Sequence, residues 1–300
     1  MTLSGIPNAF TVDVEDYFQV SAFEHRVSRK NWGKYESRVE ASTEKLLNLL
    51  ERVSVCGTFF ILGWVADRFP ALVKRIHQCG HEVASHGYWH QLIYNQDPED
   101  FREDICASRD AIANACGVEV TAYRAPSFSI TQRSYWAIEV LIENGFTIDS
   151  SIFPIAGHDR YGVPGAKKEI HELLTPKGTI IEFPPSVWHT GKFNIPIGGG
   201  YFRILPWTIS KKAIKEVRKE IGQAMFYIHP WEVDPGQPRI RGTGWKSQLR
   251  HYTGQRSSYN RLERMLKTFS FASVTQVIEA SSALNPRVKH ELPAATQLLA

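Results

Sequence analysis

The sequence has few cysteines, and no two of them are spaced as a Cys-x-x-Cys pair. Its four cysteines lie apart along the chain, at positions 56, 79, 106 and 116, so we interpret them as buried thiols in a reducing compartment. No apolar run approaches the ~20 residues that span a bilayer, and residues 1–10 lack a basic segment followed by an apolar stretch. These absences predict a cytoplasmic protein without a transmembrane segment, associated with a membrane at most through a biosynthetic complex. A processed mature chain is the alternative.

Neither sign of charge is in large excess, because the formal net charge is only +4 over 300 residues. A balance this small disfavours a nucleic-acid binder, while it is compatible with a mildly acidic polymer. The apolar fraction of 43% and the charged fraction of 22% are those of a soluble globular protein with a substantial core. They do not define an oligomeric state.

Strand-like and helix-like patterns alternate through most of the chain. Strands are expected at residues 10–14, 57–62, 82–85, 146–149, 179–183 and 224–229, and helices at 46–53, 65–80, 98–117, 131–145 and 259–269. Such alternation predicts an α/β fold with a parallel sheet, either doubly wound or closed into a barrel. We favour the barrel because polar residues recur where successive strands end.

The chain shows no internal repeat and no sharp linker, which favours one domain over residues 1–285. Its core is expected at 8–232 and a C-terminal extension at 233–285, with long loops between residues 231 and 259 because that stretch is rich in Pro, Gly and Arg. Residues 286–300 show no periodicity and are expected to be disordered.

Two histidines four residues apart are the first candidate for chemistry. His86 and His90 would lie on one side of a helical turn and could share a metal ion. A pair of surface or capping histidines explains the same spacing equally well. The pair therefore needs a further ligand before it indicates a metal site.

An acidic cluster at the end of the first strand could supply that ligand. Strand alternation places Asp13 and Glu15 on the same side, while Asp16 could turn over the end of the strand. Clustered carboxylates repel one another unless a cation or a proton intervenes. One of them could bind a metal and a second could act as a base, although solvated loop acids or a helix cap explain an isolated acidic cluster more simply.

Three more polar residues follow predicted strands. Arg124 could orient a carboxylate through paired hydrogen bonds, His229 ends an apolar strand, and Asp149 ends another. Taken singly, each is as compatible with a surface loop, a core histidine or a turn. Together they all stand where a barrel assembles its active site.

In this order, the motifs resemble those of the polysaccharide deacetylases, the NodB-like carbohydrate esterase family four. The resemblance covers residues 8 to 232 and rests on six ordered segments: Thr11–Asp13, Gly57–Gly63, Ser85–His90, Tyr123–Pro126, Gly145–Ser151 and Ile228–His229. The stretch from His229 to Arg239, with Arg250-His251-Tyr252, is similar to a bacterial subgroup associated with exopolysaccharide and exosortase gene clusters.

The resemblance implies a distorted (β/α)7 barrel and hydrolysis of N-acetyl groups on amino sugars of a polysaccharide or its precursor. It implies a divalent metal, Zn²⁺ first with Co²⁺ or Ni²⁺ as alternatives, held by His86, His90 and either Glu15 or Asp16. The usual second aspartate of the first motif is replaced here, so both carboxylates remain open. In the implied mechanism Asp13 is the base oriented by Arg124, and His229 is the acid held by Asp149.

Substrate contacts are expected from side chains beside these motifs, namely Tyr88, Trp89, Pro126, Phe128 and Trp231, with Trp188 a further aromatic candidate. The expected partner is an N-acetylated oligo- or polysaccharide, with the question of a lipid-linked precursor left open. Two other functions remain: a cyclic-amide hydrolase like the allantoinases on the same barrel, and a carbohydrate-binding protein without catalysis.

Overall fold

The computed structural model describes residues 5–156, 161–191, 193–284 and 287–292. Its strands are β1 (Asn8–Val14), β2 (Thr58–Ile61), β3 (Glu82–Ser85), β4 (Ala122–Tyr123), β5 (Ile148–Asp149), β6 (His171–Thr175), β7 (Gly178–Glu182), β8 (Val187–His189), β9 (Asn194–Pro196), β10 (Met225–Ile228), β11 (Phe271–Ala272) and β12 (Val288–Glu291).

Ten of these strands form one sheet, in the hydrogen-bonded order β10-β1-β2-β3-β4-β5-β7-β6-β12, with β11 added beside β1. All neighbouring pairs are parallel except β6 and β7, and β8 and β9 form a separate antiparallel hairpin. The predicted α/β class with a mostly parallel sheet is therefore confirmed. In the part of the chain that the structure describes, no hydrogen-bonded ladder joins the two ends of the sheet.

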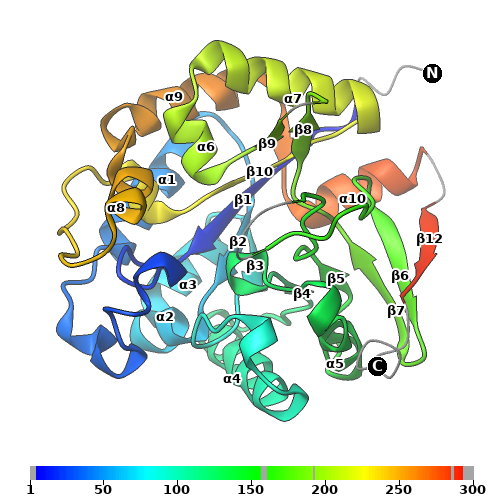
Figure 1. Ribbon diagram of the computed structural model, residues 1–300, viewed down its shortest axis with the longest axis horizontal. Coiled ribbons are helices and arrows are strands. Elements are labelled where there is room, and N and C mark those ends of the chain that lie inside the picture. Colours follow the sequence, from blue (N-terminus) through cyan, green and yellow to red (C-terminus); the bar gives the residue numbers. More distant parts are fainter. Residues whose placement is uncertain (1–4, 157–160, 192, 285–286, 293–300) are drawn as a thin grey trace.

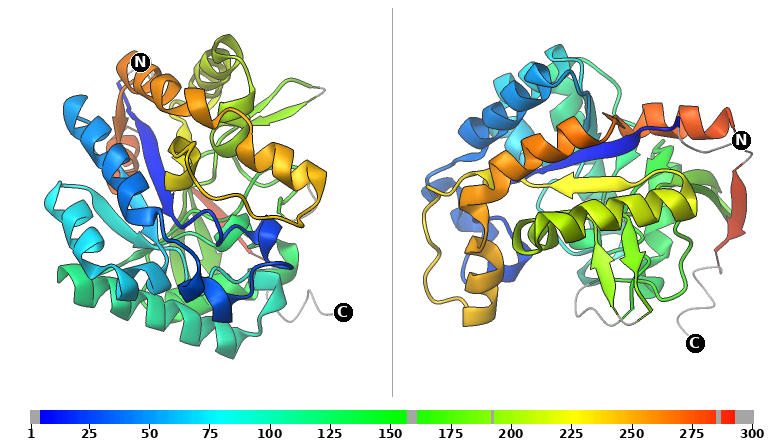
Figure 2. Two further views of the ribbon diagram at one scale, coloured as in Figure 1. Left: turned by 90° about the vertical axis from the view of Figure 1, so that its left-hand side faces the viewer. Right: turned by 90° about the horizontal axis from the view of Figure 1, so that it is seen from above.

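Helices cover the central strands, whereas β6, β7 and β12 lie at the outer edge of the sheet (Figures 1 and 2). The helices are α1 (Val39–Arg52), α2 (Gly63–Arg68), α3 (Pro70–Gln78), α4 (Pro98–Cys116), α5 (Trp136–Glu143), α6 (Gly199–Ile204), α7 (Trp207–Ile221), α8 (Trp245–Tyr252), α9 (Gln255–Thr268) and α10 (Val274–Ser282). Among the described residues, no helix combines the length and the apolar character that crossing a bilayer requires.

Strand β1 lies in the middle of the sheet, and its neighbours bring three segments of the chain to the same edge. Val12 is opposite Ile228 of β10 and Phe59 of β2, while Ile61 of β2 is opposite Ser85 of β3. All seven residues of β1 are buried, as expected for a parallel strand covered on both faces. The residues that follow β1, β3 and β10 therefore emerge together.

The predicted bounds of α4, from Pro98 to Gly117, agree with the structure, which adds Asp97 as the N-cap. Asp97 accepts hydrogen bonds from the backbone N–H groups of Glu99 and Asp100, Pro98 occupies the first turn, and Gly117 ends the helix with a φ of 76°. A glycine is favoured there because the left-handed conformation clashes with a Cβ.

Three helix predictions need correction. The helix expected at 65–80 is divided into α2 and α3, because Pro70 cannot donate a backbone hydrogen bond and starts a new helix. Thr131 caps a 3-10 turn at Gln132–Ser134 rather than α5 itself. The loops expected between residues 231 and 259 contain α8 and the start of α9, where glycines at both ends obscured two amphipathic helices.

The expectation of a disordered tail is wrong for residues 288–291. These residues form β12, which pairs in parallel with β6 at the edge of the sheet. Backbone pairing at an edge requires no apolar periodicity in the sequence, and all four residues of β12 are exposed. Residues 286 and 293–300 lie outside the described part of the chain.

The start of α2 contacts the loop that carries His86 and His90. The backbone N–H of Gly63 donates to the carbonyl of Gly87 at 2.9 Å, and the N–H of Trp64 donates to that of Tyr88. A Cβ on Gly63 would lie 2.7 Å from the Cα of Ser108 on α4 and would overlap the ring of Tyr88. Only a glycine lets α2, α4 and this loop approach so closely.

We predict that Gly63→Ala lowers the free energy of unfolding by about 1–3 kcal/mol, because an added methyl group overpacks this contact. Gly5→Ala is the matched control, since nothing lies within 4 Å of a Cβ at that position, and its effect should stay within about 0.5 kcal/mol. Urea unfolding of the three proteins measures both values. Equal stability of the two variants would contradict this packing.

Candidate functional site

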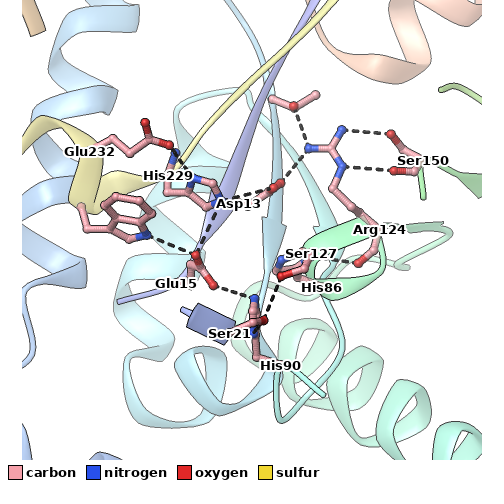
Figure 3. Close-up of polar contacts among 12 residues, drawn as sticks. Asp13, Glu15, Ser21, His86, His90, Arg124, Ser127, Ser150, His229 and Glu232 are labelled. Carbon is pink, nitrogen blue, oxygen red and sulfur yellow. Dashed lines mark hydrogen bonds and ion pairs between the residues drawn. The ribbon is translucent and has the colours of Figure 1, made fainter. Parts of the chain in front are cut away.

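The predicted polar residues meet where β1, β3 and β10 end. Asp13 and Glu15 come from β1 and the turn after it, and His86 follows β3 directly. His229 follows β10 in the same way (Figure 3). Because these strands are parallel, their carboxyl ends share one edge of the sheet, which is where the sequence predicted a site.

Glu15, His86 and His90 form a cluster of the kind that holds a metal ion. One ligand atom from each side chain lies within 4.8 Å of the other two, and the three residues are only 2–4% exposed. Imidazole nitrogens and a carboxylate oxygen are the donor types that hold zinc in proteins. Two imidazoles and one carboxylate leave further coordination positions for water or substrate.

The polar contacts of the cluster fit a cation. The Glu15 Oε2 atom lies 2.7 Å from Nε2 of His90, yet it has no aligned hydrogen-bond donor among the described residues. The Nδ1 atom of His86 lies 2.8 Å from the carbonyl of Arg124, which leaves its Nε2 free to bind. A carbonyl partner for the second nitrogen is typical of metal-binding histidines.

Burial and charge also suit metal binding. Burial would raise the pKa of the Glu15 carboxyl, but the neighbouring imidazoles, His90 foremost, lower it to about 2. Burial lowers the pKa of His86 to about 4. Both shifts favour the ionised carboxylate and the neutral imidazole that a metal requires. The donor set also suits Zn²⁺, Co²⁺ and Ni²⁺ alike.

The backbone between the two histidines is a loop, which corrects the expected helical turn. Gly87 and His90 both have positive φ, at 71° and 51°. The carboxylate of Asp104 on α4 accepts hydrogen bonds from the N–H groups of Tyr88 at 2.7 Å and Trp89 at 3.0 Å. Asp104 therefore fixes the loop, and no local pattern in the sequence identified it.

Asp16, the other candidate ligand, lies away from the cluster. Its Oδ2 atom accepts hydrogen bonds from the Ser37 hydroxyl at 2.6 Å and from the backbone N–H groups of Arg38 and Val39. Its Oδ1 accepts from the N–H of Tyr17 at 3.0 Å. Burial raises the pKa of Asp16. Its carboxylate accepts hydrogen bonds from N–H groups that would otherwise be unpaired at the start of α1, so we interpret Asp16 as a helix cap.

Asp13 is paired with Arg124, as the sequence suggested. The two side chains are 2.7 Å apart, between Nη1 and Oδ1, and Arg124 is fully buried. Its guanidinium also donates to the hydroxyl groups of Thr11 and Ser150 and lies 4.1 Å from the centroid of the Phe60 ring. Arg124 is thus held in one orientation, and it presents Asp13 to the cavity.

His229 lies close to Asp13 of β1 and to Glu15 in the turn after it, but it is oriented by a residue other than the expected one. Its Nε2 lies 3.5 Å from Glu15 Oε1 and 3.8 Å from Asp13 Oδ2. Its Nδ1 lies 2.5 Å from Oε1 of Glu232, whose second oxygen is 2.5 Å from Nε of Arg203. Burial would lower the pKa of His229, but the hydrogen bond with Glu232 and the charge of Glu15 raise it to about 9.

The expectation that Asp149 holds His229 is therefore wrong in its geometry. Asp149 accepts a hydrogen bond from Ser151 at 2.5 Å and faces Glu182 across β5 and β7. Burial raises the pKa of both carboxyl groups, so we infer that the pair shares a proton. The signal for Glu232 was its i+3 spacing after His229, the pattern of a capping box.

The expected substrate-contact residues fall into two groups. Phe128 and Trp231 line a cavity of about 880 Å³ that also contains Asp13, Glu15, His90 and His229. Tyr88, Trp89, Pro126 and Trp188 do not line it. Tyr88 donates instead to Asp67 at 2.8 Å, and Trp89 packs beside Trp32 at 6.0 Å between ring centroids.

Trp231 contacts the site on both faces of its ring. It stacks between His229, 5.0 Å away, and His251, 4.2 Å away, and its Nε1 donates to Glu15 Oε1 at 3.1 Å. The cavity is also lined by residues of α6 and α8, which the sequence did not indicate.

The fold and the clustered side chains define an α/β protein with a candidate metal site at the carboxyl ends of its strands. Residues 32–147 match the family model described as polysaccharide deacetylase, and residues 150–279 match one described as a domain of unknown function. The single sheet draws strands from both segments.

A peptidoglycan-N-acetylglucosamine deacetylase of Bacillus cereus is 26% identical over 178 residues, which are 50% of this chain and 64% of that protein. The chain spans 18% and 33% of the next two curated relatives. A solved Mycobacterium smegmatis protein, described as a candidate polysaccharide deacetylase, has a TM-score of 0.59 and 22% identity over 93% of this chain and 92% of that one.

The chain is therefore similar to polysaccharide deacetylases over residues 32–147, and it shares the fold of the Mycobacterium smegmatis protein. A family-four pseudoenzyme from Bacillus anthracis shares the fold too, with a TM-score of 0.52 and 13% identity, over 96% of this chain and 70% of that one. The fold alone therefore does not establish catalysis, which has to be argued from the side chains.

We predict that Glu15→Gln weakens zinc or cobalt binding by more than about 100-fold, because loss of a ligand exceeds the ~10–100-fold cost of losing an outer-sphere partner. Asp16→Asn removes the same charge one residue away and should change the affinity by less than about threefold, since its carboxylate caps α1. Titration calorimetry on the metal-free proteins measures both affinities. An equal loss in the two variants would rule out this ligand set.

Proposed function

We propose that the protein hydrolyses N-acetyl groups on amino sugars of a polysaccharide or its precursor, with a divalent metal held by Glu15, His86 and His90. One observation carries this proposal. Glu15 and His90 of the ligand cluster, the Arg-paired carboxylate of Asp13 and the carboxylate-oriented His229 all line a single cavity. The Bacillus cereus relative is named as a deacetylase of N-acetylglucosamine in peptidoglycan, which is the same class of bond.

A divalent cation in the cluster would polarise the acetamide carbonyl and lower the pKa of a coordinated water. Asp13, fixed by Arg124, accepts the proton of the water whose oxygen attacks the carbonyl carbon. His229 then donates a proton from Nε2 to the nitrogen as the C–N bond breaks. Water and amide thereby become acetic acid and a free amine.

The arrangement of Glu232 and Arg203 supports the role of His229. Arg203 fixes one oxygen of the Glu232 carboxylate. Burial alone would raise the pKa of Glu232, but Arg203 and His229 lower it below its usual value. The other oxygen holds Nδ1 of His229, so Nε2 is directed at the space beside Asp13. Glu232 is thus a positioning residue, in the place that the sequence had assigned to Asp149.

We extend the proposal to zinc as the metal and to exopolysaccharide or cell-envelope metabolism in the cytoplasm as the setting. The segment from His229 to Arg239 supports the setting through its resemblance to the exopolysaccharide-associated subgroup. A single domain with its core at 8–232 is supported by the pairing of β1 with β10. The Bacillus cereus deacetylase favours neither an allantoinase-like hydrolase nor a binding protein without catalysis.

The direct test is acetate release from a panel of N-acetylated oligosaccharides by the metal-loaded protein. We expect activity in the wild type, a ~10²–10⁴-fold loss in Asp13→Asn because the base is removed, and a comparable loss in His90→Ala. Asp110→Asn is the matched control, because its side chain is 68% exposed on α4. Equal release by the wild type and the Asp13 variant would exclude the proposed mechanism.

The same assay separates Glu232 from Asp149. Glu232→Gln should lower kcat by about 10²-fold with little change in KM, because it affects the acid rather than substrate binding. Asp149→Asn should keep kcat within about tenfold, since Asp149 contacts neither His229 nor the cavity. A larger kcat loss in the Asp149 variant than in the Glu232 variant would indicate that Asp149, not Glu232, supports His229.

A further inference from the structure

The cavity extends well beyond the catalytic side chains. Its volume of about 880 Å³ lies in the upper part of the ~300–1,000 Å³ range of pockets that bury most of a drug-sized ligand. It therefore has room for more than one acetamido sugar. The far wall is formed by α6 and α8, which both lie in the segment that matches a domain of unknown function.

This wall carries large apolar side chains that are exposed to solvent. Tyr201 and Ile204 of α6 are 38% and 48% exposed, and Trp245 and Leu249 of α8 are 71% and 60% exposed. All four line the cavity. Clustered apolar exposure of this kind marks a binding surface, and we call these four residues the apolar wall.

Two cations accompany the apolar wall. Lys246 and Arg250 are exposed on α8 and line the same cavity. Each follows a residue of the apolar wall, Trp245 or Leu249, and residues four apart on a helix lie on one side. Residues 233–285 contain eight Lys or Arg and three Asp or Glu, a balance of +5. The whole chain is only +4, so this extension carries the excess positive charge.

The wall is fixed to the catalytic site by Arg203. This buried side chain of α6 donates to the backbone carbonyls of Arg250 and His251 on α8, each at 3.0 Å. It also contacts the Glu232 carboxylate that orients His229. Arg203 therefore fixes the position of α8 relative to His229, as expected if α8 and His229 contact the same ligand.

The chemistry of the wall distinguishes between ligands. Ile204 and Leu249 cannot hydrogen-bond to hydroxyl groups, so a continuing sugar chain would lose hydration there without compensation. An alkyl chain gains from the same contacts, and a phosphate group is complementary to Lys246 and Arg250.

On the basis of the proposed function, we propose that the substrate is an N-acetylamino sugar linked through phosphate to a lipid. The acetamido group lies at Glu15, His86 and His90, the phosphate at Lys246 and Arg250, and the first part of the lipid on the apolar wall. The catalytic end of the cavity thus selects the sugar, and α6 with α8 selects its carrier.

Three substrates test this assignment: an uncharged N-acetylglucosamine oligomer, N-acetylglucosamine carrying a methyl diphosphate, and the same head group on a polyprenyl chain in detergent micelles. We expect kcat/KM for acetate release to rise by about 10-fold or more from the methyl to the polyprenyl compound, as burial of one large apolar side chain implies.

Variants of the wall identify the cause of that preference. Leu249→Ala and Trp245→Ala should each reduce the polyprenyl-to-methyl ratio by about threefold or more. Phe193→Ala is the matched control, because Phe193 is 67% exposed but does not line the cavity, and its ratio should equal that of the wild type. Lys246→Ala with Arg250→Ala should reduce kcat/KM for both diphosphates relative to the uncharged oligomer.

The outcomes separate this inference from the proposed function. Acetate release from the oligomer with no preference for the polyprenyl compound overturns the inference and leaves the proposed function standing. No release from any substrate by the metal-loaded protein overturns the proposed function. Binding to phosphatidylglycerol vesicles that depends on Trp245 and Leu249, without selective hydrolysis, would make the wall a membrane contact instead and would also overturn the inference.

Discussion

A buried carboxylate beside two buried imidazoles is the arrangement on which the site depends. Glu15 Oε2 lies 2.7 Å from Nε2 of His90 but has no aligned hydrogen-bond donor among the described residues, so the neighbouring imidazoles offset much of the cost of burying this carboxylate. A cation between these atoms would bind the carboxylate and both histidines at once. It would therefore stabilise this part of the fold as well as supply a catalyst.

The parallel sheet brings these groups together, and buried ion pairs keep them in place. Arg124 is fully buried and fixes Asp13, while Arg203 fixes Glu232 and through it His229. Asp13 and His229 thus each have their own guanidinium support. Because Arg203 also contacts α8, residues from both matched segments of the chain contribute to one candidate site.

Much of this could be predicted from the sequence where a signal is local. The strand ends that carry Asp13, His86 and His229 followed from apolar runs, and α4 followed from Pro98 and Gly117. The choice between Glu15 and Asp16 could not be made, because it depends on Ser37 and the start of α1, which only tertiary structure brings near. Glu232, by contrast, is only three residues from His229, so a local signal was present but was not read as a partner for the histidine. Helix α8 was missed because polar and glycine residues mask its short apolar face. The boundary between core and extension stays a prediction.

The central claim is that one cation binds Glu15, His86 and His90 together. A crystal structure grown with zinc, with diffraction recorded on both sides of the zinc absorption edge, tests this most directly. We expect an anomalous peak ~2.0–2.2 Å from one atom of each of the three side chains. A peak beside Asp16, or none at this site under saturating zinc, would contradict it.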